Sequence, residues 1–206
     1  MNTIKEVCVE SYDEALRAVA AGATRIELCD NLAVGGTTPS YGTIKMCVER
    51  LSVPVMVMIR PRGGNFIYST DEYEIMQNDI SLCKDLNAAG VVFGLLDVNG
   101  NIDVERTLFL VQLARPMKVT FHKAIDETSD IMDSVAVLKE IGTNRILSSG
   151  GKATALEGMH RLNQMIHLAG DQLSIIVAGK VNYENFEEIR NKIPNGEYHG
   201  RRLVAF

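Results

Sequence analysis

The sequence predicts an α/β fold: a TIM-type (β/α)8 barrel that lacks, or nearly lacks, its eighth helix. Eight short apolar segments recur at roughly 25-residue spacing, and segments of helical pattern alternate with them. This alternation is typical of βαβ units, whose strands pair in parallel through right-handed crossovers. No glycine-rich dinucleotide fingerprint follows the first strand, so the barrel is favoured over the alternative, a doubly wound sheet.

Length and composition predict one soluble domain spanning residues 1–206. The net charge of −5 argues against a general nucleic-acid binder, which would need a basic surface. The N-terminus has no apolar signal core and no apolar run is long enough for a membrane helix, so we expect a cytoplasmic protein without a membrane partner. The four cysteines are far apart and form no C-x-x-C motif, which favours reduced thiols.

The strands are recognised as short apolar runs between a helical segment and a polar loop. The clearest is the run Val55 to Ile59, which suits a parallel strand covered on both faces and ends in a loop with two arginines and two glycines. The eight expected strands are 6–9, 25–28, 55–59, 91–93, 118–121, 145–147, 173–178 and 197–199.

The helices are recognised by their capping residues and glycine stops. Ser11 is expected to cap the first helix, with Glu14 three residues on and Gly22 at its end. Ser69 and Thr70 are expected to cap a helix that ends at Gly90. Further helices are expected from residue 41 to strand three, over 104–113 and 131–141, and in segments ending at 168 and 192. Only Arg201 to Phe206 follow the last strand, which leaves too few residues for an eighth helix.

Strand alternation predicts polar side chains inside the barrel. If the valines, isoleucine and leucine of the first two strands face the helices, then Cys8, Glu10, Glu27 and Cys29 face the interior. The same parity points Arg60 and His122 toward the barrel axis or mouth. A barrel interior is normally packed with branched apolar side chains, so these groups require partners or a function.

Two kinds of chemistry are expected at the carboxyl ends of the strands. The acid/base candidates are Glu10, Glu27, His122 and Asp126. The candidates for holding an anion are Arg60, Arg62, Lys123, Ser149 and Gly150, the last two in the loop SSGGK. Two alternatives remain open. Glu10 and Glu27 could instead be structural counter-ions of Arg60 or Arg25, and Cys47 and Cys83 are interpreted as small core residues on helices.

At these motifs the sequence resembles the CutC family, which is named for copper homeostasis. The resemblance covers nearly the whole chain, from Val7 to about His199. It is carried by the motifs EVCVES, RIELC, GGTTPSYG, VMIRPRGGNFIYS, VVFGLL, VTFHKAID, SSGG and ALEG. It implies a TIM-barrel fold, a cytoplasmic location and cysteines proposed as Cu(I) ligands, which fall on Cys8 and Cys29. The chain departs from the family pattern at Lys123, where an arginine is usual, and in the segments after strands seven and eight.

Two functional hypotheses follow. In the first, the protein binds Cu(I) through Cys8 and Cys29 and takes part in copper homeostasis. In the second, it is an enzyme of unassigned reaction that acts on a small anionic substrate at the barrel mouth. We also expect a homo-oligomer, because a barrel without its eighth helix leaves part of its outer face bare.

Overall fold

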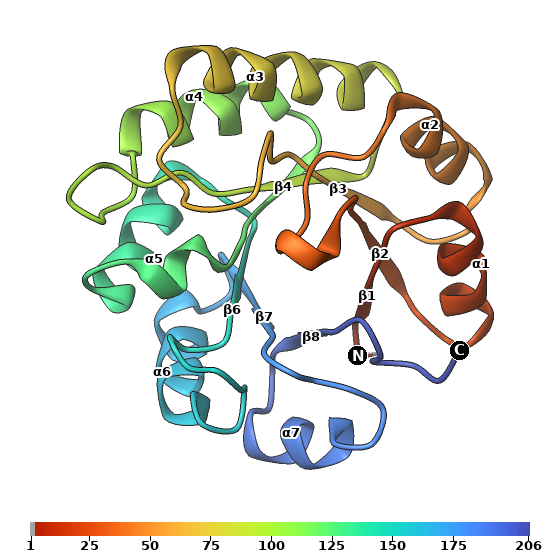
Figure 1. Cartoon of the computed structure of the whole chain (residues 1–206). Helices are drawn as coiled ribbons and strands as arrows, with labels where there is room; N and C mark the ends of the chain where they lie inside the picture. The colour runs from red at the N-terminus through yellow and green to blue at the C-terminus, as the bar shows by residue number, and fades with distance from the viewer. Residues whose placement is uncertain (1–2) are drawn as a thin grey trace.

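The computed structural model describes residues 3–206 and forms a closed barrel of eight parallel strands in sequence order (Figure 1). The strands are β1 (Lys5–Val9), β2 (Arg25–Leu28), β3 (Val55–Met58), β4 (Gly90–Phe93), β5 (Lys118–Phe121), β6 (Arg145–Ser148), β7 (Ser174–Val177) and β8 (Glu197–His199). Pairing of β8 with β1 closes the barrel. The predicted fold class is therefore confirmed.

In the described residues 3–206, seven α-helices surround the barrel (Figure 1). They are α1 (Tyr12–Ala20), α2 (Tyr41–Arg50), α3 (Thr70–Asp85), α4 (Val104–Ala114), α5 (Ile131–Ile141), α6 (Met159–Ala169) and α7 (Phe186–Lys192). Two 3-10 helices, η1 (Leu32–Val34) and η2 (Lys123–Glu127), lie in the loops that follow β2 and β5. Among residues 3–206, none of the helices is long and apolar enough to cross a membrane.

The strand residues divide between two faces as their alternation predicts. Val7, Val9, Ile26 and Leu28 are fully buried in the layer between the strands and the surrounding helices. The alternate residues of β2 and β3, and the residue directly after β2, point into the barrel. There Cys29, Met56 and Met58 pack in a separate cluster. Successive side chains of a strand point to opposite faces. The outward side chains therefore build the main core, and the inward ones include both this small cluster and the polar residues at the carboxyl ends of the strands.

One expected boundary is wrong: the helix that begins after Ser69 does not run to Gly90. Its start is as expected, since Ser69 and Glu72 form a reciprocal capping box. The helix ends at Asp85, and Asn87 then adopts a left-handed conformation with φ of 59°. Gly90 instead opens β4, where a Cβ would overlap the Met56 side chain inside the barrel. Glycine is needed at position 90 not as a helix stop but because the neighbouring strands leave no room for a side chain.

No helix follows β8 in the described part of the chain, in agreement with the sequence. Residues 200–206 continue from the end of β8 toward α1 (Figure 1). Leu203 and Val204 in this segment are buried and belong to the hydrophobic core.

Candidate functional site

A cavity of about 350 Å³ opens at the carboxyl ends of the strands. Several strands contribute to it, because the inward residue near the end of each parallel strand reaches the same end of the barrel. Its polar lining is Cys8, Glu27, Arg60, His122, Lys123, Asp126, Glu127 and His199. Its apolar lining is Leu32, Val34, Met58, Phe66 and Leu147, together with Gly35. The volume lies at the lower end of the range for small-molecule sites.

Three potential metal ligands meet at one side of this cavity. One donor atom each from Cys8, Glu27 and His199 lies within 4.8 Å of the other two. Cys8 and Glu27 are register partners on β1 and β2, and β8 brings His199 beside them because it pairs with the other edge of β1. Closure of the barrel therefore assembles this group from the first, second and last strands.

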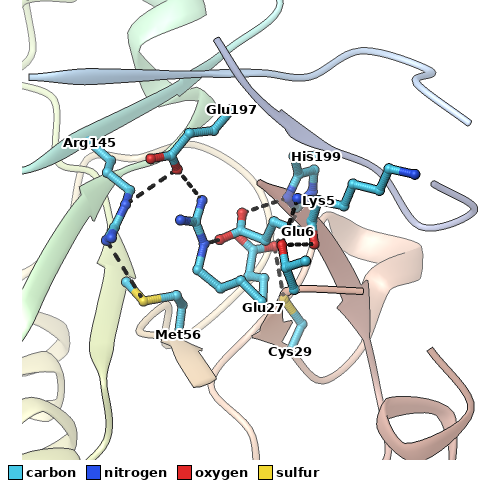
Figure 2. A network of polar contacts seen from close by, with 10 residues as sticks. Lys5, Glu6, Glu27, Cys29, Met56, Arg145, Glu197 and His199 are labelled. Carbon is cyan, nitrogen blue, oxygen red and sulfur yellow. Dashed lines mark hydrogen bonds and ion pairs between the residues drawn. The ribbon is translucent and has the colours of Figure 1, made fainter. Parts of the chain in front are cut away.

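The orientation of His199 is fixed by two carboxylates. Its Nδ1 lies 2.9 Å from Oε1 of Glu6, and its Nε2 lies 3.8 Å from Oε2 of Glu27. Figure 2 shows the imidazole beside these two glutamates. A carboxylate on one imidazole nitrogen orients the ring and leaves the other nitrogen for a ligand, as in many metal sites.

Burial and charge oppose each other in setting the proton affinities here. Burial by itself would lower the pKa of His199, but the nearby Glu27 carboxylate and Cys8 raise it well above its ordinary value. Burial also raises the pKa of Glu27, and the charge of Glu6 adds to this effect. Burial would likewise raise the pKa of Glu6, yet Arg25 and His199 outweigh it and lower that pKa to about 2. The result is a protonated imidazole held beside a firmly ionised Glu6.

A network of buried ion pairs forms the floor below this group (Figure 2). Arg25 pairs with both Glu6 and Glu197, and Arg145 lies 3.4 Å from the Glu197 carboxylate. Each buried charge thus has an opposite partner, which offsets the cost of removing it from water. The network joins β1, β2, β6 and β8 and supports His199 through Glu6.

Cys29 lies next to this group but outside it. Its Sγ donates a hydrogen bond to Oε2 of Glu27 over 3.5 Å. Burial raises the pKa of the Cys29 thiol well above its ordinary value, and the charge of Glu27 raises it further. Cys8 and Cys29, the two thiols expected to bind Cu(I), both point into the barrel near Glu27. Cys8 belongs to the group with Glu27 and His199. Cys29 contacts Glu27 but is not a member of that group.

Arg60 and His122 line the same cavity and share Phe66 as a neighbour. The Arg60 guanidinium carbon lies 4.9 Å from the centre of the Phe66 ring, and the His122 ring lies 4.8 Å from it. Arg60 donates to the carbonyl oxygens of Val34, Gly36 and Gly64. Among the described residues it has no carboxylate partner, so the counter-ion role considered for Glu10 and Glu27 does not apply to Arg60.

Asp126 is held by the loop that follows β6. Its carboxylate accepts hydrogen bonds from the Ser148 and Ser149 hydroxyls and from the backbone N–H groups of Ser149 and Gly151. The Gly150 N–H donates to the Ser148 hydroxyl. The N–H groups expected to bind an external anion are thus already occupied within the chain. Lys123, whose Nζ lies 3.8 Å from Asp126, remains half-exposed at the cavity rim.

Glu10 and Arg62 lie outside the cavity lining. Glu10 accepts hydrogen bonds from the Leu32 N–H and from Arg201. Arg62 forms an ion pair with Glu72 in the first turn of α3. Both side chains are therefore committed to local loop structure. His199 is a site residue that is not among those predicted from the sequence, although strand parity identifies it: Tyr198 packs outward in the core, so the next residue points inward.

Comparison with known proteins places these residues in a family. A family model described as the CutC family matches residues 3–203. The chain belongs to the CutC family. A mouse protein named as a copper homeostasis protein cutC homolog is 43% identical over 196 residues, covering 95% of this chain and 72% of the mouse protein. A CutC family protein of Mesorhizobium japonicum is 42% identical over 194 residues, covering 94% of this chain and 75% of that protein.

Two solved structures share the fold of this chain, and one of them is a CutC protein. The crystal structure of a CutC protein from Streptococcus agalactiae superposes with a TM-score of 0.94 at 36% identity, covering 98% of this chain and all of that one. A deoxyribose phosphate aldolase from Aeropyrum pernix superposes with a TM-score of 0.68 at 12% identity, covering 97% and 86% of the two chains. At that identity the likeness concerns the barrel fold alone.

Proposed function

We propose that this CutC family member is a cytoplasmic copper-binding protein of copper homeostasis that holds Cu(I) with Cys8 and His199, with Glu27 as a third donor. The single observation that carries the proposal is the convergence of these three donors within 4.8 Å at the end of the barrel. The names of the mouse and human relatives, both copper homeostasis protein cutC homologs, point to the same metal.

Two of the three donors suit copper: the sulfur of Cys8 is a soft ligand and the imidazole nitrogen of His199 is a borderline one. Thiolate sulfur favours Cu(I), and imidazole nitrogen is a common copper ligand. Oε1 of Glu27 is buried and has no hydrogen-bond partner in the described chain, which a bound cation would satisfy. The protonated His199 would release its proton on binding, so copper affinity is expected to rise with pH.

A Cu(I) titration against a competing chelator tests the proposal. Cys8→Ser and His199→Asn are expected to weaken binding at least tenfold, because each removes a direct ligand. Cys29→Ser is the matched control: it removes a buried thiol beside Glu27 but no member of the group. Equal affinity of wild type, Cys8→Ser and His199→Asn would overturn the proposal. An equal loss in Cys8→Ser and Cys29→Ser, with none in His199→Asn, would favour the thiol pair instead.

An enzyme acting on a small anionic substrate is a second candidate. The observation that favours it is the Arg60 guanidinium, which is buried at the cavity without a carboxylate partner among residues 3–206. A cavity that combines a fixed cation with donors of hydrogen bonds is suited to a ligand with a negative charge.

A further inference from the structure

Arg60 differs from the two other arginines inside the barrel, Arg25 and Arg145. Arg25 and Arg145 both pair with glutamates of the floor. Arg60 is only 4% exposed, and its guanidinium contacts three carbonyl oxygens and the face of Phe66. Its Nε is buried and has no hydrogen-bond partner in the described chain. A buried charge is costly without an opposite charge, so the cavity beside Arg60 favours an anion.

His122 supplies a second unpartnered donor at the same cavity. Its Nδ1 accepts a hydrogen bond from the Ala124 N–H, which places the imidazole proton on Nε2 in the neutral ring. Burial lowers the pKa of His122 to about 3, and the charge of Arg60 contributes, so the ring is neutral at ordinary pH. His122 is 4% exposed and lines the cavity. Its Nε2 is buried and has no hydrogen-bond partner among residues 3–206.

Neighbouring residues hold Arg60 and His122 in these positions. Phe66 contacts both, which keeps the guanidinium and the imidazole on one wall of the cavity. Gly94 lies against the imidazole: a Cβ at this position would be 2.5 Å from Nδ1 of His122. The inward position of His122 therefore depends on the absence of a side chain at Gly94.

We propose that Arg60 and His122 form a subsite for the carboxylate group of a small organic monocarboxylate. Both side chains line the cavity, and the Nε–H of Arg60 and the Nε2–H of His122 are their donors without a partner in the described chain. Both nitrogens are buried, so a carboxylate reaches them only when the neighbouring side chains shift slightly, and Phe66, Met58 and Leu147 line the space for its apolar part. The inference deepens the second candidate function and does not depend on bound copper.

A carboxylate fits these donors better than a phosphate. Phosphate sites in proteins combine several backbone N–H groups with cations. The loop that could supply such N–H groups is occupied by Asp126, through Ser149 and Gly151. What remains at this wall is one fixed cation and one neutral N–H donor, which matches a single negative charge shared by two oxygens.

Binding to metal-free protein tests the subsite. Pyruvate, isobutyrate and benzoate are the probes, with benzamide as the neutral counterpart of benzoate and inorganic phosphate as the competing anion. Calorimetry gives the affinity, and ¹⁵N spectra of the four histidines report the Nε2–H of His122. We expect at least one monocarboxylate to bind at millimolar concentration or below and to shift the His122 resonances, and benzamide to do neither.

Variants locate the binding. Arg60→Met is expected to weaken it about 10- to 100-fold, the range for a hydrogen bond to a charged group. Gly94→Ala is expected to weaken binding because the added methyl group displaces the His122 imidazole and leaves Arg60 unchanged. This variant tests the subsite even if Arg60→Met does not fold. Arg106→Met is the matched control, since Arg106 packs over Tyr73 at 4.9 Å outside the cavity.

Three results would overturn the inference. They are the absence of binding by all three monocarboxylates, equal binding of benzoate and benzamide, and unchanged affinity in both Arg60→Met and Gly94→Ala. Binding of phosphate without binding of any monocarboxylate would also overturn the inference. The second candidate function, an enzyme acting on a small anionic substrate, would still stand. Because the protein is free of metal, none of these results bears on copper binding.

Discussion

Replacing Glu6 by Gln removes the carboxylate that joins the floor of the barrel to the candidate site. Glu6 is fully buried and pairs with Arg25 on one side and His199 on the other. In Glu6→Gln, Glu197 becomes the one carboxylate shared by Arg25 and Arg145 among the described residues. A buried positive charge is then incompletely compensated, so the folded state is expected to be destabilised.

The magnitude follows from the pKa of Glu6. Although burial raises it, Arg25 and His199 bring the pKa from 4.5 to about 2 in the folded protein. At neutral pH this difference corresponds to about 3 kcal/mol of stability. The value agrees with the roughly 3–5 kcal/mol lost when one partner of a buried ion pair is removed.

The sign of the pH dependence is fixed by the lowered pKa. A carboxyl group with a lower pKa in the folded state contributes fully above about pH 4.5, and the contribution is lost as the pH falls through about 2. At pH 3, about 2 kcal/mol of the contribution is already gone. The difference in unfolding free energy between wild type and Glu6→Gln should therefore shrink from pH 7 to pH 3.

Urea unfolding at pH 7 and pH 3 measures both quantities. Glu188→Gln is the matched control, because Glu188 pairs with Lys192 over 2.7 Å on the exposed face of α7. This surface pair is expected to contribute less than about 1 kcal/mol. The reasoning is refuted if Glu6→Gln costs no more than Glu188→Gln at pH 7, or if its cost is the same at pH 3.

Two further predictions concern packing and assembly. Gly90→Ala is expected to lower stability by about 1–3 kcal/mol in thermal unfolding, because its Cβ would overlap Met56 and the Lys118 carbonyl oxygen. Gly42→Ala in α2, where nothing lies within 4 Å of the added Cβ, should be neutral or stabilising; equal losses in both variants would contradict the packing argument. Light scattering is expected to give a mass at least twice 22.7 kDa, because no helix covers β8 and β1 in the described chain; a monomeric mass at micromolar concentration would contradict this.

Local sequence determined the elements of this barrel and the faces of its strands. The run at β3 and the capping box at Ser69 specify their elements without reference to distant residues. Alternation along β1 and β2 also determined that Cys8 and Glu27 face inward, because side-chain direction has a period of two residues.

The tertiary structure decided which inward side chains meet. His199 joins Cys8 and Glu27 because β8 closes on β1, a pairing between opposite ends of the chain. The Asp126 carboxylate accepts hydrogen bonds from the N–H groups of the loop after β6, which the sequence predicts to be available to an external anion. Among residues 3–206 Arg60 forms no ion pair, although Glu27 lines the same cavity, because its guanidinium is turned to the loop carbonyl oxygens of Val34, Gly36 and Gly64. Strand parity is a local property, but height along the barrel axis and the choice of charge partner depend on register and closure, which no short stretch of sequence contains.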